Sequence, residues 1–121
     1  MNIMHVLVKN APNTASLDPA RYGYNSWREY WENNGGRRFY LFYGLKRISV
    51  NGRRKWALIF KCPACGRNFL WDGEAPDCFD GCHVNIVGDI SKKLYITPLC
   101  HTCNQQNVIA RVSKVNLIPA P

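Results

Sequence analysis

Acidic side chains are scarce in this chain: its 121 residues include 8 Asp and Glu against 16 Lys and Arg, which gives a formal net charge of +8. The shortage is concentrated in one segment, because residues 37–61 contain no acidic side chain and eight basic ones. Residues 62–121 are balanced, with five side chains of each sign. A surface with this excess attracts polyanions, so nucleic acid is the expected partner. The alternative is a solvated sheet face whose cations discourage pairing between sheet edges.

Long apolar runs are missing as well. Segments such as 56–60 are far shorter than the roughly 20 residues that cross a bilayer, so we expect neither a transmembrane helix nor a membrane partner. The first residues also lack the basic start, apolar centre and small-residue cleavage site of a secretory signal. We therefore expect a cytoplasmic protein, and in a reducing compartment its 6 Cys are better suited to metal binding than to disulfides.

Several catalytic signatures are absent from the sequence. There is no Gly-x-Ser-x-Gly nucleophile motif, no glycine-rich phosphate loop followed by Lys and Ser or Thr, and no His-Glu-x-x-His. Enzyme classes that depend on these motifs are thereby excluded. Internal repeats and low-complexity tracts are missing too, which leaves a single domain over residues 1–121 as the expected organisation.

The N-terminal part contains a predicted helix. Ser26 and Glu29 have the Ser-x-x-Glu spacing of a capping box, and two glycines at 35–36 end the pattern. One face of this helix carries three aromatic residues spaced three and four apart: Trp27, Tyr30 and Trp31. Such a stripe packs a small helix against a sheet more often than it stacks on nucleic-acid bases. A short first strand and a turn-rich loop over residues 10–24 precede the helix.

Strand-forming residues follow in three runs, at 39–43, 48–50 and 56–60. Asn51 and Gly52 separate the last two runs and predict a two-residue hairpin, because both central residues of the favoured turn need positive φ. The basic residues lie at the strand ends and around this turn, where they could bind phosphates. The predicted nucleic-acid-binding set is Arg37, Arg38, Lys46, Arg47, Arg53, Arg54, Lys55 and Lys61.

Four of the 6 Cys form two Cys-x-x-Cys pairs, which lie at 62–65 and 100–103. The first pair is followed by a glycine that permits the left-handed turn of a zinc knuckle, and the second pair suits the start of a helix. Four thiolates close a tetrahedral coordination sphere, so the predicted cofactor is a structural Zn²⁺ held by Cys62, Cys65, Cys100 and Cys103. The alternatives are two unrelated thiol pairs or a redox-active pair.

The sequence leaves the role of Cys78 and Cys82 open. With His83 or His101 as a further ligand, the two cysteines could hold a second ion, although their spacing is looser than that of the Cys-x-x-Cys pairs. The alternative is that both are free, partly buried thiols that pack as small apolar side chains.

Two segments resemble the core of HNH nucleases: residues 81–88, with a His-Val strand, and residues 95–104, which end in Leu-Cys-x-x-Cys-Asn. In that family a β-hairpin and a helix grip a catalytic divalent ion, while outlying Cys-x-x-Cys pairs hold structural zinc. The resemblance implies that His83 is the general base that deprotonates water, that Asn104 contacts metal or phosphate, and that Mg²⁺ or Mn²⁺ is the catalytic ion. From the residues alone, His83 could instead cap a strand or helix by hydrogen bonding.

These patterns predict an α+β fold, in which a small antiparallel sheet with one N-terminal helix is joined to a zinc-bound treble clef of the ββα-metal type. The basic helix-and-sheet part would span residues 1–61, the treble clef 62–107, and a C-terminal strand or tail 108–121. The expected function is the binding of DNA or RNA. One alternative is an HNH/HNN endonuclease, and another is an interaction protein of a phage or mobile element that blocks a host enzyme.

Overall fold

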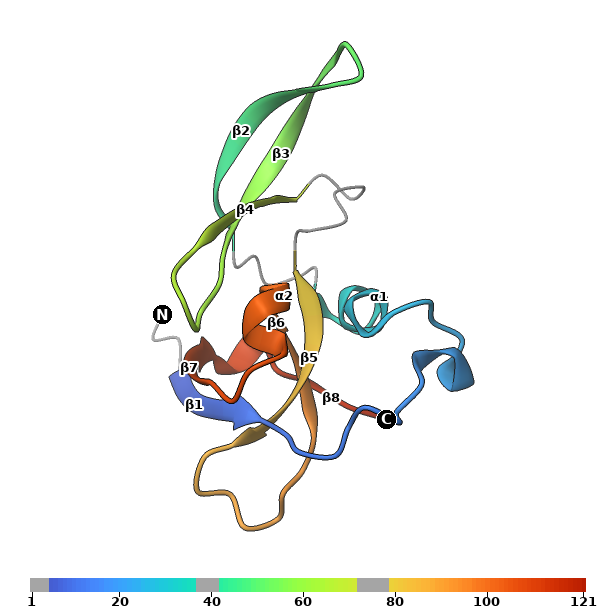
Figure 1. Cartoon of the computed structure of the whole chain (residues 1–121), viewed down its shortest axis with the longest axis vertical. Coiled ribbons are helices and arrows are strands. Elements are labelled where there is room, and N and C mark those ends of the chain that lie inside the picture. Colours follow the sequence, from blue (N-terminus) through green and yellow to red (C-terminus); the bar gives the residue numbers. More distant parts are fainter. Residues whose placement is uncertain (1–4, 37–41, 72–78) are drawn as a thin grey trace.

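Two antiparallel sheets of unequal size make up the fold (Figure 1). The computed structural model describes residues 5–36, 42–71 and 79–121. A five-stranded sheet and one packed helix form the larger part, which we call the body, from residues 5–36 and 79–121. A three-stranded sheet within residues 42–71 projects from the body as an arm. The prediction of an α+β fold with a small antiparallel sheet and one N-terminal helix is therefore confirmed.

The sheet of the body combines strands from both ends of the chain in the order β7-β1-β5-β6-β8. Its members are β1 (His5–Asn10), β5 (Asp80–Ile86), β6 (Tyr95–Leu99), β7 (Ile109–Ser113) and β8 (Ile118–Pro119). Within β1, Val8 is only 1% exposed and pairs with Ile86 of β5, while Val6 pairs with Val112 of β7. Burial of these apolar side chains places the first strand with the C-terminal half of the chain, and not in the sheet of the basic segment.

The arm consists of β2 (Phe42–Val50), β3 (Arg53–Lys61) and β4 (Asn68–Trp71), in that spatial order. Asn51 and Gly52 connect β2 to β3 with φ angles of 52° and 76°. Positive φ at both positions is the geometry that an Asn-Gly pair favours in a two-residue turn. The hairpin predicted at this dipeptide is thus confirmed.

The helix α1 (Trp27–Asn33) begins where the local sequence predicts. The Glu29 N–H donates to the Ser26 hydroxyl at 3.0 Å, and the Asn25 N–H donates to the Glu29 carboxylate at 3.2 Å, so two amides at the helix start are satisfied. The other helical segments given for the described residues include α2 (His101–Asn104) and 3-10 turns over Pro19–Tyr22 and Lys114–Asn116. None of the helices in the described ranges combines the length and the apolar content needed to cross a membrane.

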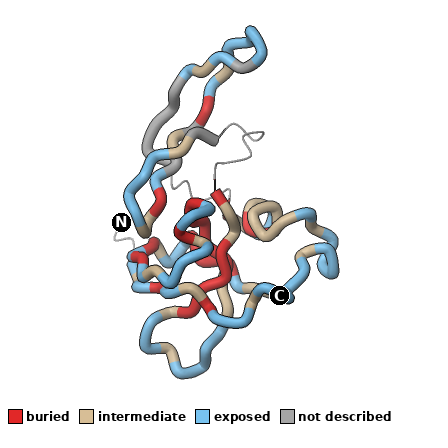
Figure 2. Tube along the Cα trace, viewed as in Figure 1, coloured by how far each residue is buried: buried red, intermediate tan, exposed pale blue. Residues whose placement is uncertain are grey.

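The aromatic stripe of α1 packs against β5 and β6. Trp31 is fully buried, its ring lies edge-on to Phe79 at 5.8 Å, and its indole N–H donates to the Asn116 carbonyl at 2.8 Å. The Tyr30 hydroxyl donates to the carbonyl of Pro119 in β8 at 2.7 Å. The predicted core role of the stripe is confirmed, and the C-terminal residues pair as a final strand with β6. Figure 2 shows that buried residues are concentrated in the body.

The helix α1 approaches β5 so closely that one position of the strand requires glycine. A Cβ atom added at Gly81 would lie 2.4 Å from the Trp27 carbonyl carbon and 2.5 Å from the Arg28 nitrogen. These are backbone atoms, which cannot rotate away as the end of a flexible side chain can. Gly81 therefore allows the start of α1 to lie directly on β5, two residues before His83.

Candidate metal centre and adjoining cleft

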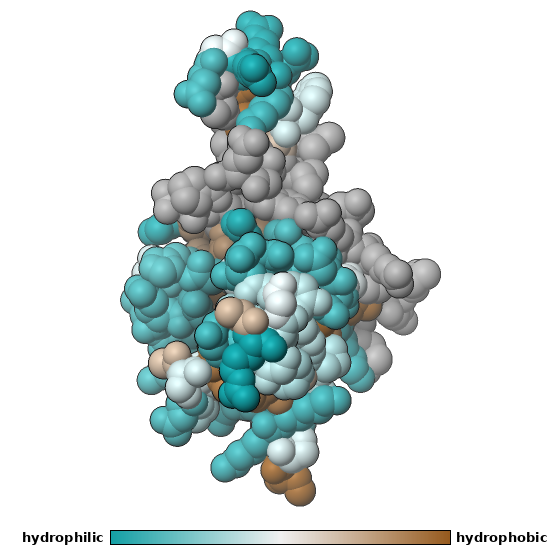
Figure 3. All heavy atoms as spheres, turned by 90° about the vertical axis from the view of Figure 1, so that its right-hand side faces the viewer, coloured by the Kyte–Doolittle hydropathy of each residue, from teal (hydrophilic) through white to brown (hydrophobic). Residues whose placement is uncertain are grey.

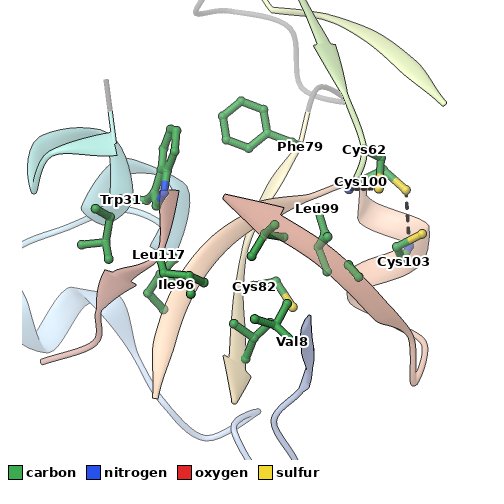
Figure 4. Close-up of a cluster of buried hydrophobic side chains, with 14 of the residues drawn as sticks. Val8, Trp31, Cys62, Phe79, Cys82, Ile96, Leu99, Cys100, Cys103 and Leu117 are labelled. Carbon is green, nitrogen blue, oxygen red and sulfur yellow. Dashed lines mark hydrogen bonds between the residues drawn. The ribbon is translucent and has the colours of Figure 1, made fainter. Parts of the chain in front are cut away.

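Four cysteines from distant parts of the chain meet where the arm joins the body. Figure 4 labels three of them: Cys62, Cys100 and Cys103. Cys62 follows β3, Cys100 follows β6, and Cys65 and Cys103 complete the cluster, with all four sulfur atoms within 4.8 Å of one another. The Cys65 and Cys100 Sγ atoms are 3.8 Å apart. This matches the edge of about 3.8 Å in a tetrahedron built on Zn–S bonds of about 2.3 Å. The cluster could therefore hold a metal ion such as zinc.

Local backbone geometry directs the thiols of each Cys-x-x-Cys pair toward the centre of the cluster. In the first pair, the Gly66 N–H donates to the Cys62 carbonyl at 2.9 Å and the Cys62 N–H donates to the Arg67 carbonyl at 3.0 Å, which closes a tight turn. Gly66 adopts a φ of 76°, a conformation that side chains with a Cβ rarely accept. In the second pair, Cys100 caps α2, because the Cys103 N–H donates to the Cys100 sulfur at 3.4 Å.

The protonation of the cluster's thiols is coupled to cation binding. Burial raises the pKa of the Cys100 and Cys103 thiols, so that without a cation these groups retain their protons. A hydrogen bond from the Arg67 backbone lowers the pKa of Cys65, the exposed member of the cluster. Coordination must release the protons of the buried thiols, and lowering the pH must therefore favour loss of the metal.

An ion in this cluster would link the arm to the body. Cys62 and Cys65 belong to the turn between β3 and β4, whereas the other two ligands belong to the start of α2. Beside this turn, Ala64 and Phe69 of the arm are partly buried against the core of the body. Coordination would thus hold the base of the arm against the body at the same place as this small apolar contact.

Cys82 lies in the core and outside the four-cysteine cluster (Figure 4). Its side chain is 2% exposed, and burial raises the pKa of its thiol to about 12, so it remains protonated at neutral pH. Cys78 lies outside the described residues. Among the residues that the structure describes, the Cys62, Cys65, Cys100 and Cys103 cluster is the one group of three or more such side chains that could hold a metal ion.

Asn10, at the end of β1, bonds the C-terminal end of α2, next to the four-cysteine cluster. Its side-chain N–H groups donate to the carbonyls of Cys103 at 3.3 Å and Asn104 at 3.2 Å and to the Cys82 sulfur at 3.4 Å. Its Oδ1 accepts from the Val108 N–H at 3.1 Å. The Asn10 amide therefore bonds two carbonyl groups at the C-terminal end of α2, of which that of Cys103 also accepts from the Gln106 N–H at 3.2 Å. No local pattern identifies this residue, because its partners lie 72 to 98 positions away.

Replacing this amide should loosen the metal centre. We expect Asn10→Ala to lower the free energy of unfolding by about 1–3 kcal/mol, because the Asn104 carbonyl loses this donor and the Val108 N–H loses its acceptor. We also expect faster transfer of zinc to a chromophoric chelator. The matched control is Lys9→Ala, which changes the exposed neighbouring position. Equal unfolding curves and equal transfer rates for the two variants would show that Asn10 does not hold α2.

His83 and Asn104, the two residues that the resemblance singles out, line one cavity of about 400 Å³. His83 is 7% exposed, and its ring lies edge-on to the ring of Trp27, with ring centres 4.6 Å apart. Its Nε2 atom is buried and has no hydrogen-bond partner among the described residues. Burial lowers the pKa of this imidazole, so it is neutral at pH 7 and can accept a proton.

Beside this cavity, the Asp80 carboxylate contacts both the first and the last residue of α2, His101 and Asn104. Its Oδ2 atom accepts from the Asn104 amide at 3.0 Å and lies 2.6 Å from the His101 Nδ1. The sequence offered His101 as a further ligand for a second ion held by Cys78 and Cys82, but in the structure its imidazole lies against the Asp80 carboxylate. Asp80 also lines a second cavity next to Trp27, so a carboxylate is available at this edge of the sheet.

The predicted nucleic-acid-binding residues divide by position. Arg47, Arg53, Arg54 and Lys61 are exposed on the arm and Lys55 is half-buried there, while Lys46 lies in β2. Arg37 and Arg38 lie outside the described residues. Trp56 adds a signal that the charge pattern alone does not contain: it is 60% exposed, and the Arg47 guanidinium lies 5.6 Å from its ring centre.

Comparison with known proteins assigns no family to the chain. No protein-family model, no curated protein and no solved structure matches it. The resemblance to HNH nucleases therefore depends on residues 81–88 and 95–104 alone. The metal centre, the cleft at His83 and the basic arm are the features from which function has to be inferred.

Proposed function

We propose that this chain is a zinc-binding protein that binds nucleic acid through its arm. The observation that carries the proposal is the set of cationic side chains on β2 and β3, in a segment, residues 37–61, whose own sequence contains no acidic residue. Arg47, Arg53 and Arg54 are exposed there, and Trp56 offers an aromatic ring beside them. Cations that contact phosphates, together with an exposed aromatic side chain, are the usual chemistry of such surfaces.

Zinc has a structural role in this proposal. Four cysteine sulfurs suit Zn²⁺ in both ligand type and tetrahedral arrangement, and they leave no coordination position for a reactive water. The order of knuckle, β5–β6 hairpin and α2 supports a treble clef of the HNH type. The zinc would hold the arm at a constant position on the body. The cationic side chains of the arm would then contact the same nucleic-acid molecule together.

The first test removes the cations next to the hairpin turn. We expect the triple variant Arg53→Gln, Arg54→Gln and Lys55→Gln to bind nucleic acid on the order of 10-fold or more weakly at moderate salt. The slope of log K against log salt should fall by about 2.7, because each lost phosphate contact removes about 0.9. Fluorescence anisotropy over a salt series measures both quantities.

The matched control removes three exposed cations from the body: Lys9→Gln, Arg111→Gln and Lys114→Gln. It carries the same net charge as the arm variant but should retain most of the affinity. Equal losses in both variants would mean that overall charge, and not the arm, drives binding. A wild-type affinity that does not change with salt would contradict nucleic-acid binding and favour a protein partner.

A second candidate function is phosphodiester cleavage at the His83 cavity. The observation that favours it is the buried, unpartnered Nε2 atom of a neutral imidazole, which could accept the proton of an attacking water. Mg²⁺ is commonly held by one or two carboxylates together with substrate phosphates. The carboxylate nearest in the fold is Asp80, which lines the adjoining cavity; both cavities are lined by Trp27, Gly81 and Asn104. When bound, such an ion would stabilise the leaving oxygen.

Plasmid nicking with Mg²⁺ or Mn²⁺ tests this candidate. We expect His83→Ala to abolish nicking with unchanged zinc content, while His5→Ala, at an exposed histidine, leaves it intact. Because burial lowers the pKa of His83 below 6.5, the base form persists in mild acid, and the rate should hold its plateau to lower pH than for an ordinary histidine. Wild-type protein that fails to nick DNA with either ion would eliminate the candidate.

A further inference from the structure

The outer half of the arm carries cations on both of its faces. Directly opposite residues of an antiparallel pair share a face, and successive residues alternate between faces. Arg47 lies opposite Trp56 and Ser49 opposite Arg54, so one face contains two guanidinium groups. Ile48 lies opposite Lys55 and Val50 opposite Arg53, so the other face contains one guanidinium and one ammonium group.

This half of the arm is a two-stranded ribbon. Within the described residues, β4 pairs with positions 58–61 of β3 and does not extend to positions 53–57. Figure 1 shows the ribbon pointing away from the body, and Figure 3 shows a mainly hydrophilic surface at its tip. The four residues of each strand from the Arg47–Trp56 pair to the turn span about 13 Å at about 3.3 Å per residue.

We infer that this ribbon inserts into the major groove of duplex DNA, a role that rests on the nucleic-acid binding proposed above. The groove is about 12 Å wide and about 8.5 Å deep and is lined by phosphates along both walls. A strand pair with its side chains is about 10 Å thick, so the ribbon fits the width and reaches the base edges. Cations on both faces match phosphates on both walls, whereas a flat or single-sided ligand would use only one face.

The same geometry favours B-form DNA over other nucleic acids. The major groove of an RNA duplex is deep and narrow and does not admit a ribbon of this thickness. A single strand presents one backbone, and so it would contact one face at a time. On one face of the ribbon, the Trp56 ring holds the Arg47 guanidinium by a cation–π contact, which steadies a cation that would face one of the phosphate walls.

Competition among three probes tests the choice of ligand. The probes are a short DNA duplex, the RNA duplex of the same sequence and the single DNA strand, each measured by anisotropy with the zinc-loaded full chain. We expect the DNA duplex to bind about tenfold or more tightly than the other two, because it alone offers a groove of the right width. Equal or tighter binding of RNA or of the single strand would overturn the inference but not the proposed function. Failure of all three probes to bind at low salt would overturn both.

Two double variants of equal charge test the use of both faces: Arg47→Gln with Arg54→Gln, and Arg53→Gln with Lys55→Gln. Each should lower the salt slope for duplex DNA by about 1.8, from two phosphate contacts at about 0.9 each. Lys9→Gln with Arg111→Gln is the control on the body. Loss of affinity in only one of the two ribbon variants would show that a single face binds, which contradicts insertion into a groove. Zinc content and circular dichroism establish that the variants are folded.

Discussion

Removal of the proposed zinc ion with a strong chelator is expected to abolish the cooperative thermal unfolding of this protein. The apparent binding free energy of a structural zinc is about 10–16 kcal/mol, which equals or exceeds the typical stability of about 5–15 kcal/mol for a whole domain. Three of the four proposed ligands belong to the buried core: Cys62, Cys100 and Cys103. Loss of the ion would therefore remove a cross-link inside the core and leave uncoordinated thiols there. Calorimetry and elemental analysis before and after chelation measure the effect.

Two cysteine variants make this expectation specific. Cys103→Ser should reduce the zinc content to well below one ion per chain and mimic chelation. Cys82→Ala should retain the full content, because Cys82 lies outside the cluster although it is just as buried. A chelated protein that still unfolds cooperatively at the original temperature would contradict a structural role for the metal.

Truncation of Trp31 is the second change with a large expected effect. Trp31→Ala should lower the free energy of unfolding by about 3–5 kcal/mol, the usual cost of removing a large buried aromatic ring. The ring is fully buried between α1 and the sheet, and Gly36 packs directly against it. Its indole N–H also bonds the Asn116 carbonyl, which the variant leaves without a donor. Urea denaturation followed by circular dichroism measures the change.

The matched control for this experiment is the same substitution at an exposed site. Trp56→Ala removes a ring that is 60% exposed on the arm, so its effect on unfolding should stay within about 0.5 kcal/mol. The two variants should also separate in function, because only Trp56 lies on the proposed nucleic-acid surface. If both variants were equally destabilised, the core of the body would not depend on Trp31 as its burial indicates.

The elements that sequence analysis predicted correctly are those with local causes. The capping of α1 by Ser26 and Glu29 and the turn at Asn51 depend on residues two to four positions apart. The two Cys-x-x-Cys pairs are likewise local turns, since each places its thiols by hydrogen bonds within a few residues. Such features need only the propensities of neighbouring residues, which the sequence displays directly.

Other features of the site carried no local signal. The position of β1 beside β5 depends on which apolar strand best fills the centre of the sheet. The sequence of His5–Asn10 has no pattern that identifies β5 as its neighbour. Asn10 appears in the sequence as an ordinary turn residue, yet it bonds the end of α2. The edge contact of His83 with Trp27 likewise depends on the packing of α1 against Gly81.

The sequence by itself determined the types of side chain available: thiols spaced for one ion, an acid-free basic segment, and aromatic residues on one helix face. Only the tertiary structure decided that the two thiol pairs meet at the base of the arm and that the Asn10 amide binds the end of α2. The physical reason is that these arrangements join residues 35 to 98 positions apart. Such contacts form when the free energy gained by burying the whole core exceeds the entropic cost of closing long loops. A short stretch of sequence does not determine either quantity.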